Sequence, residues 1–295
     1  MKMRSIGNVG RDEMLTQFQI QYVDSKIVEA MGELTVGRKL FAPRSIPVGK
    51  KVYTYYSETD MSDAVITMGG NTQAGDVTLY DDNDVRVPAI SKDMFVQWRD
   101  IQASREDDPN LLDRYARNAA KQVIEEEDKL MITGEYTGWG AYNIEGLATK
   151  TGRLPVAGGA WPTNAQANIN TARAALEAAG FYEEPILIAR PTIAKYLDTF
   201  VTGTATTYRQ AFLEENGILS DIMECTSLYT AAGLTTNALL VVPDPDYLYY
   251  VEGQPPVTTW WYDKDGNAHG KVREVIAPVI AHAGCIAEIT AITSG

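Results

Sequence analysis

The chain has 295 residues and carries 26 Lys and Arg against 39 Asp and Glu, which gives a formal net charge of −13. Hydrophobic residues make up 45% and charged residues 22%, a balance typical of a folded globular protein and not of a chain disordered throughout. The acidic balance argues against a general nucleic-acid binder, because phosphate backbones attract basic surfaces. Only two histidines are present, which is few for an enzyme.

No apolar run reaches the roughly 20 residues of a membrane-spanning helix. The basic start, Met1–Ser5, is not followed by the apolar core of a signal peptide, so we expect the protein to stay in the compartment where it is made. Cys225 and Cys285 lie in apolar or mixed surroundings, which predicts buried free thiols and no disulfide framework.

The N-terminal part predicts an extended arm over residues 1–10. A helix should follow from Asp12 to Gly32, because apolar residues recur there at three- and four-residue spacings. We expect residues 38–49 to form a connector, since they contain Pro43 and Pro47.

A projecting β-arm is predicted next. Lys51–Ser57 is rich in β-branched and aromatic residues and predicts a strand, and Val77–Tyr80 predicts a second one. An acidic turn, Asp81–Asp84, then precedes a third run from Val85 to Ile90. The segment from about 50 to 92 has little core of its own, so we expect it to need a partner surface.

The most regular helical pattern begins at Asp108-Pro109 and predicts a long spine helix over residues 109–133, ended by Gly134. An acidic run, Glu125–Asp128, lies near its C-terminal end, where negative charge is unfavourable to the helix dipole. Glu127 falls on the apolar stripe, so two interpretations stand: a buried Glu127 paired with an arginine, or a solvated acidic face.

The C-terminal half mixes short helices and strands without a regular βαβ order, which indicates the α+β class. The predicted elements are helices over 163–180, from 191 and over 208–215, buried strands over 185–189 and 238–242, and strand-like runs over 247–251, 257–262 and 272–292, the last broken at Pro278. Asp265-Gly266 predicts a hairpin turn.

Searches for catalytic patterns find none. The chain has no phosphate-binding Gly-rich loop followed by Lys and a hydroxyl, and no serine flanked by the glycines of a nucleophile elbow. We expect His269 to be exposed near a turn and His282 to be a hydrogen-bonded core residue. Asp263–Asn267 resembles a calcium loop only superficially, because its glycine comes too early, and is better read as a hairpin turn.

Two further clusters have an ordinary structural explanation. Asp81, Asp82 and Asp84 have the side chains to bind a divalent cation, but a solvated turn is the simpler interpretation. The aromatic residues Trp260, Trp261, Tyr247, Tyr249 and Tyr250 would suit a sugar-binding platform, yet in alternating strands they usually supply packing. We therefore predict no catalytic, cofactor-binding or metal-binding residues, no cofactor and no enzymatic activity.

A family resemblance rests on four consecutive segments. Val87–Lys92 leads into Phe95–Ile101, and Asp113–Lys121 precedes Glu126–Gly134, which contains an acidic pair followed by a closing glycine. Together with the order of elements, these segments resemble the major capsid proteins of tailed bacteriophages and archaeal viruses with the Hong Kong 97 fold, and the encapsulin shell proteins that share that fold.

The resemblance implies a domain organisation. Residues 1–40 would form the N-terminal arm and helix, 41–92 the projecting E-loop that lies over a neighbouring subunit, and 93–144 the peripheral domain with the spine helix. Residues 145–265 would form the axial domain, and 266–295 C-terminal strands that return to the peripheral domain.

It also implies assembly into a homo-oligomeric icosahedral shell built of pentamers, with or without hexamers. Some members of the family cross-link through an E-loop lysine, but residues 61–75 contain none, and Lys50, Lys51 and Lys92 lie at the base. We therefore expect assembly without covalent cross-links.

Three functions remain open from the sequence. The first, which we favour from the sequence, is a viral major capsid protein that encloses double-stranded DNA without recognising its sequence, assembled in the host cytoplasm. The second is a cytoplasmic encapsulin shell around a cargo enzyme. The third is a soluble oligomeric enzyme that uses the carboxylate pair Glu127 and Asp128.

Overall fold

The computed structural model describes residues 35–58, 80–107, 111–134, 144–201, 205–215, 217–229 and 236–294. The helix predicted over 12–32 and the tip of the arm lie outside these residues. The helices are α2 (Gly37–Leu40), α3 (Trp98–Asp107), α4 (Leu111–Thr133), α5 (Ala165–Ala178), α6 (Pro191–Ala194) and α7 (Tyr208–Gln210), with short helical turns η1 (Lys195–Asp198), η2 (Ala211–Glu215), η3 (Ser227–Tyr229) and η4 (Ala283–Cys285).

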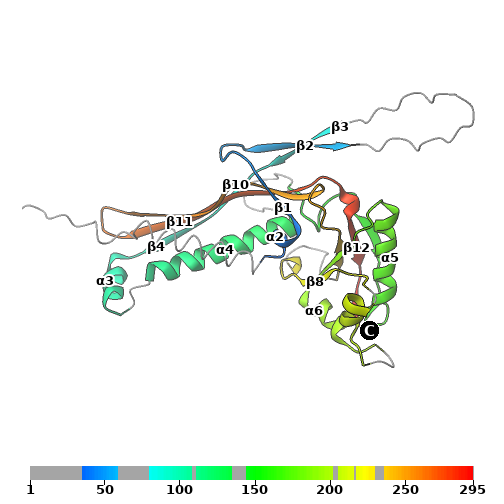
Figure 1. Cartoon of the computed structure of the whole chain (residues 1–295). Helices are drawn as coiled ribbons and strands as arrows, with labels where there is room; N and C mark the ends of the chain where they lie inside the picture. Colours follow the sequence, from blue (N-terminus) through cyan, green and yellow to red (C-terminus); the bar gives the residue numbers. More distant parts are fainter. Residues whose placement is uncertain are drawn as a thin grey trace, which may run out of the picture.

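Four strands form a long sheet in the order β1-β10-β11-β4. Their bounds are β1 (Ala42–Ser45), β4 (Ala89–Val96), β10 (Leu248–Tyr262) and β11 (Ala268–Ile280). Helix α4 lies along one face of this sheet in contact with β4 and β11 (Figure 1). We call this the inner face, and the opposite face the outer face.

A second sheet has the strand order β5-β12-β9-β7-β8 and packs against α5 (Figure 1). Its strands are β5 (Leu154–Ala157), β7 (Ile186–Ala189), β8 (Asp221–Glu224), β9 (Ala238–Val241) and β12 (Ile286–Thr290), and a short pair joins β6 (Ala160–Trp161) to β13 (Thr293–Ser294). The C-terminal segment therefore divides between the sheets, with β11 in the long sheet and β12 in the second.

The spine helix forms as predicted over Leu111–Thr133, and its predicted start at Asp108-Pro109 lies outside the described residues. Ala116, Val123, Glu127 and Met131 all lie on its buried side. It ends at Gly134, whose φ of +74° is the left-handed conformation that glycine adopts freely. The last carbonyl groups of the helix accept hydrogen bonds from the following segment, since the N–H groups of residues 147 and 148 bond to residues 131 and 132.

The projecting arm is a hairpin of β2 (Val52–Glu58) and β3 (Tyr80–Arg86). We call the end of the long sheet where the turn at Gly266 joins β10 to β11 the distal end, and the arm extends away from it (Figure 1). The sequence expectation was wrong here in two respects. Asp81–Asp84 is part of strand β3 and not a turn, and the run predicted from Val85 to Ile90 divides between β3 and β4. The division falls at Pro88, which has no N–H to continue a ladder.

Three other local expectations were wrong. The predicted connector 38–49 contains α2 and β1, and the runs 247–251 and 257–262 are one strand, β10, with register shifts between Glu252 and Val257. Strand β11 also continues through Pro278, which pairs with Tyr250 and does not break it. The helices over 165–178 and from 191, the strands at 186–189 and 238–241, and the turn at Gly266 agree with prediction.

Candidate assembly surfaces and a buried ionic cluster

The base of the arm is anchored on the outer face of the long sheet. Tyr55 of β2 and Val87 form a buried cluster with side chains of β10 and β11, namely Tyr249, Val251, Ala277 and Val279. The rings of Tyr53 and Tyr249 meet edge to face with centroids 6.3 Å apart. Burial raises the pKa of Tyr249 above its ordinary value. The arm is therefore held in place at its base by its own chain.

The arm has a second face that is uncovered in the described part of the chain. Tyr56 is 64% exposed and Val52 41% exposed. In the hairpin register Tyr56 pairs with Asp82, and Thr54 with Asp84. Asp81, Asp82 and Asp84 are exposed, as the solvated interpretation requires, but they lie on a strand, and Asp84 accepts a hydrogen bond from the Thr54 hydroxyl at 2.6 Å.

The distal end of the outer face carries a row of aromatic side chains across three strands. Trp261 of β10 pairs with His269 of β11, which pairs with Phe95 of β4. The His269 ring stacks on Trp261 at a centroid distance of 5.6 Å and meets Phe95 at 5.1 Å. Phe95 is 50% exposed and Trp261 46% exposed. We call this row, with the neighbouring Lys271 and Arg273 of β11, the distal strip.

His269 is only half-buried, and the expectation that it is exposed was wrong because the aromatic rings enclose it. Its Nε2 lies 3.2 Å from Asp263, the first residue of the hairpin turn. Asp263 also accepts hydrogen bonds from Asn267, which lower its pKa to about 2. The segment is the hairpin turn predicted from its sequence. Of the other aromatic residues, Tyr249 and Tyr250 are buried, in agreement with a packing role.

His282 also differs from expectation. Its Nδ1 accepts a hydrogen bond from the N–H of Gly284, but the residue is exposed and lies against Phe181 and Tyr247 at the surface. The strand ends at Ile280, so the residue falls in the turn and not in the core. Cys225 and Cys285 are buried free thiols as predicted, and burial raises the pKa of both to about 12.

An ionic cluster joins the spine helix to the sheet. The Arg38 Nε donates to Glu127 at 2.6 Å, and its Nη2 donates to Glu274 of β11. Nη2 also lies 3.4 Å from Glu252 of β10, and Nη1 donates to the Tyr250 hydroxyl at 3.3 Å. Glu127 and Glu274 are fully buried. The interpretation of Glu127 as a buried acid paired with an arginine is thus confirmed.

The cluster perturbs its own ionisation. Burial raises the pKa of Glu127 to about 7, against the opposing attraction of Arg38. Burial and the charge of Glu127 raise the pKa of Glu274 to about 9. Burial alone would lower the pKa of Arg38, but the two carboxyl groups raise it above its ordinary value.

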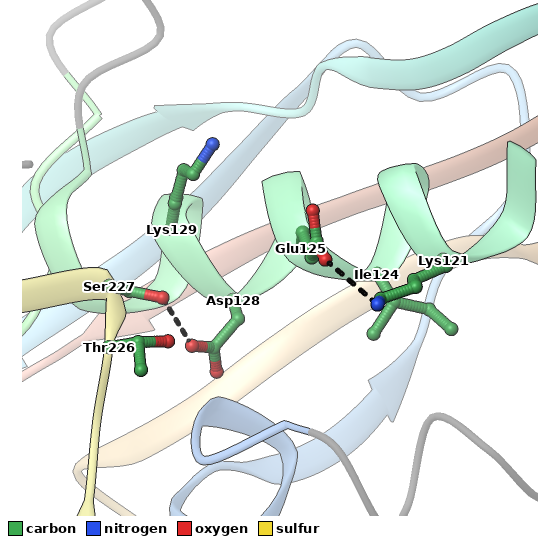
Figure 2. A pocket seen from close by; sticks show the side chains of 7 residues that line it. All are labelled: Lys121, Ile124, Glu125, Asp128, Lys129, Thr226 and Ser227. Carbon is green, nitrogen blue, oxygen red and sulfur yellow. Dashed lines mark hydrogen bonds and ion pairs between the residues drawn. The ribbon is translucent and has the colours of Figure 1, made fainter. Parts of the chain in front are cut away.

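Asp128 points elsewhere. Its Oδ1 accepts hydrogen bonds from the N–H groups of Val36 and Gly37 at 2.9 and 3.0 Å, and its Oδ2 accepts one from the Ser227 hydroxyl at 2.6 Å. Figure 2 shows this contact at the edge of a cavity of about 290 Å³. The cavity is lined by Lys121, Ile124, Glu125, Asp128, Lys129, Thr226 and Ser227.

Glu127 and Asp128 therefore have separate partners, and they do not form the carboxylate pair that the enzyme hypothesis requires. Among the described residues, no three His, Cys, Asp or Glu side chains are grouped to hold a metal ion. In the same part of the chain, no helix is both long and apolar enough to span a membrane.

A long sheet backed by a spine helix, a second sheet with its own helix and a projecting hairpin define the Hong Kong 97 fold. A virus-like particle from Pyrococcus furiosus shares this fold at a TM-score of 0.64 and 13% identity, over 93% of this chain and 100% of that chain. The capsid protein of Myoviridae phage XM1 matches at a TM-score of 0.68 and 13% identity, over 87% of this chain and 91% of that chain.

The sequence assigns the chain more narrowly. Residues 13–255 match the family described as encapsulating protein for peroxidase, and the chain belongs to this family. The type 1 encapsulin shell protein EncA of Myxococcus xanthus is 28% identical over 141 residues. That match spans about half of each protein, 47% of this chain and 47% of the relative.

The distal strip and Arg38 as the partner of Glu127 were not anticipated from the sequence. Phe95 is separated from Trp261 and His269 by more than 160 positions along the chain. The pairing of Trp261 with His269 could have been inferred, because the two residues lie on either side of the predicted hairpin turn in strands that alternate aromatic and polar residues.

Proposed function

We propose that this protein is the subunit of a closed homo-oligomeric shell of the encapsulin type, which encloses a protein cargo in the cytoplasm. The match of residues 13–255 to the family of encapsulating proteins carries this proposal. The subunit itself is structural, and any chemistry belongs to the cargo.

A viral capsid that encloses double-stranded DNA, the function favoured from the sequence alone, is the second candidate. It is supported by solved structures of the same fold that come from phage capsids. The net charge of −13 is compatible with a shell that encloses DNA without binding it, because the acidic protein and the DNA phosphates repel each other and counterions screen that repulsion. In this case the protein belongs to the virion.

The contents of purified particles distinguish the two candidates. Particles are treated with nuclease, opened, and analysed for DNA by gel electrophoresis and for protein by mass spectrometry. The encapsulin proposal predicts one abundant cargo protein and no protected DNA. Protected DNA of uniform genomic length would contradict it and establish the viral function.

Within the shell, the arm within residues 41–92 acts as the E-loop, and residues 93–144 belong to the peripheral domain. Residues 145–265 act as the axial domain except for β10, which lies in the long sheet beside the spine helix. The segment 58–84 contains seven acidic residues and no Lys or Arg. The distal strip carries two cations beside half-exposed aromatic rings: Arg273, and Lys271, whose Nζ lies 3.3 Å from Asp93 of β4. Strands β2 and β3 extend away from the distal end of their own sheet (Figure 1), so the arm does not run toward the distal strip of its own subunit. The arm of a neighbouring subunit therefore covers the strip.

Charge reversal tests this contact. Lys271→Glu with Arg273→Glu should abolish shells, as should Asp60→Lys with Asp63→Lys, because each leaves like charges facing one another. All four substitutions together should restore them. Lys39→Glu with Lys195→Glu is the matched control, since both residues are exposed and the net charge changes equally. If the wild-type protein forms shells and the fourfold variant forms none, the result would contradict the contact.

A further inference from the structure

Two buried carboxyl groups in the ionic cluster each have one oxygen atom without a partner. Arg38 donates to Oε1 of both Glu127 and Glu274, while Oε2 of each residue has no hydrogen-bond partner. A buried carboxylate oxygen left in this state is strongly unfavourable, since it loses its hydration without replacement. Two such oxygens in adjacent groups call for a common explanation.

The charges around the pair do not balance if every group is ionised. Helix α2 contributes one cation, Arg38, and α4 contributes Glu127. Strands β10 and β11 contribute Glu252 and Glu274, and the Tyr250 hydroxyl adds a neutral contact. The adjacent position on β4 is apolar, because Ile90 pairs with Glu274. One guanidinium thus faces three carboxyl groups, two of them fully buried.

We infer that Glu127 and Glu274 share one proton between their Oε2 atoms, and that this proton locks α2 onto the spine helix and the sheet. In this arrangement Glu274 is the acid that donates, Glu127 is the carboxylate that accepts, and Arg38 bridges both through their Oε1 atoms. Every buried oxygen of the pair then has a partner. The charge of Arg38 is then balanced by that of Glu127. The partly exposed Glu252 is the remaining carboxyl group of the cluster.

The ionisation of the cluster agrees with this geometry. The pKa of Glu274 is raised to about 9 and that of Glu127 to about 7, both by burial first, and the two side chains act on each other as hydrogen-bonding partners. Both pKa values lie above the ordinary 4.5, so the neutral form is favoured in the folded state. The stabilisation is full below pH 4.5 and is lost as the pH rises toward 9.

The consequence is a pH-dependent lock on α2. Above the titration range, two adjacent ionised carboxylates compete for one guanidinium and repel each other. Arg38 then no longer holds both α4 and β11, and α2 is released. The lock belongs to the single subunit and does not depend on shell formation.

Infrared difference spectroscopy tests the shared proton directly, because a carboxylic acid and a carboxylate absorb at distinct frequencies. At pH 7 the wild-type protein should show a carboxylic acid band that is lost in Glu274→Gln, whose amide can still donate to Glu127. Glu252→Gln is the matched control, since that carboxyl group also contacts Arg38, and it should keep the band. A wild-type spectrum without the band, or a band unchanged by Glu274→Gln, would overturn the inference.

A thermal measurement adds a second criterion. The melting temperature of the wild-type subunit should fall between pH 5 and pH 9, and that of Glu274→Gln should fall less, because its amide has no proton to lose. Equal slopes in the two proteins would also overturn the inference. Both measurements apply to unassembled subunits, so a protein that forms no shells would contradict the proposed function and leave this test intact.

Discussion

Arg38 Nε donates to Glu127 Oε1 at 2.6 Å and so joins the short helix α2 to the spine helix α4. Because Glu127 is fully buried, removal of the guanidinium would leave an uncompensated carboxyl group in the interior. We expect Arg38→Ala to lower the free energy of unfolding by about 3–5 kcal/mol, the usual cost of breaking a buried ion pair.

Denaturant titration of the unassembled subunit measures this change. Lys39→Ala is the matched control: Lys39 is adjacent in sequence but exposed, and the change should stay within about 0.5 kcal/mol. Equal effects of the two substitutions would show that Arg38 does not stabilise the fold through Glu127.

Ser227 and Thr226 line the same cavity but differ in their contacts. The Ser227 hydroxyl donates to the buried Asp128, whereas Thr226 has an exposed side chain. A hydrogen bond to a charged group contributes about 1.5–3 kcal/mol. Ser227→Ala should therefore reduce the free energy of unfolding by that amount and Thr226→Ala by much less. Similar losses for both variants would exclude a specific role of the Ser227–Asp128 contact.

The end of the spine helix requires glycine at position 146. A Cβ atom there would lie 2.5 Å from the backbone nitrogen of Gly134 and 2.8 Å from the carbonyl of Ile132. Since these are backbone atoms, relief needs a shift of the chain, and Gly146→Ala should cost about 1–3 kcal/mol. Gly49→Ala, where a Cβ meets nothing within 4 Å, provides the control and should unfold nearly as the wild type does.

Deletion of residues 58–76 should leave a folded subunit that does not assemble. The base of the arm keeps its own anchors, because Tyr55 and Val87 remain buried against the sheet. The circular dichroism spectrum should match that of the wild type, while size-exclusion chromatography should show no shells. Normal shells from the deleted chain would refute the role assigned to the arm.

Local sequence patterns were sufficient for the spine helix. Its apolar stripe predicted α4 over the described residues 111–133 and placed Glu127 on that stripe, but it left a buried acid and a solvated acidic face both open. The partner was not predictable, since Arg38 lies 89 residues away and only the folded chain brings the two together.

Proline caused most of the errors in strand prediction. Pro43 lies in β1 at the edge of the long sheet, where a missing N–H is tolerated. Pro278 lies in β11 beyond Val275, the last position that pairs with β4, so one side of the strand is free there. Asp81–Asp84 were expected in a turn because acids are rare in strands, but among the described strands β3 pairs only with β2, and its acids are exposed.

The central claim is that copies of this chain close into a shell, and imaging the purified full-length protein by negative-stain electron microscopy tests it most directly. The account predicts hollow particles of uniform diameter, tens of nanometres across, that elute near the void volume of a size-exclusion column. Folded monomers or small oligomers alone, under all conditions in which the subunit is intact, would contradict it.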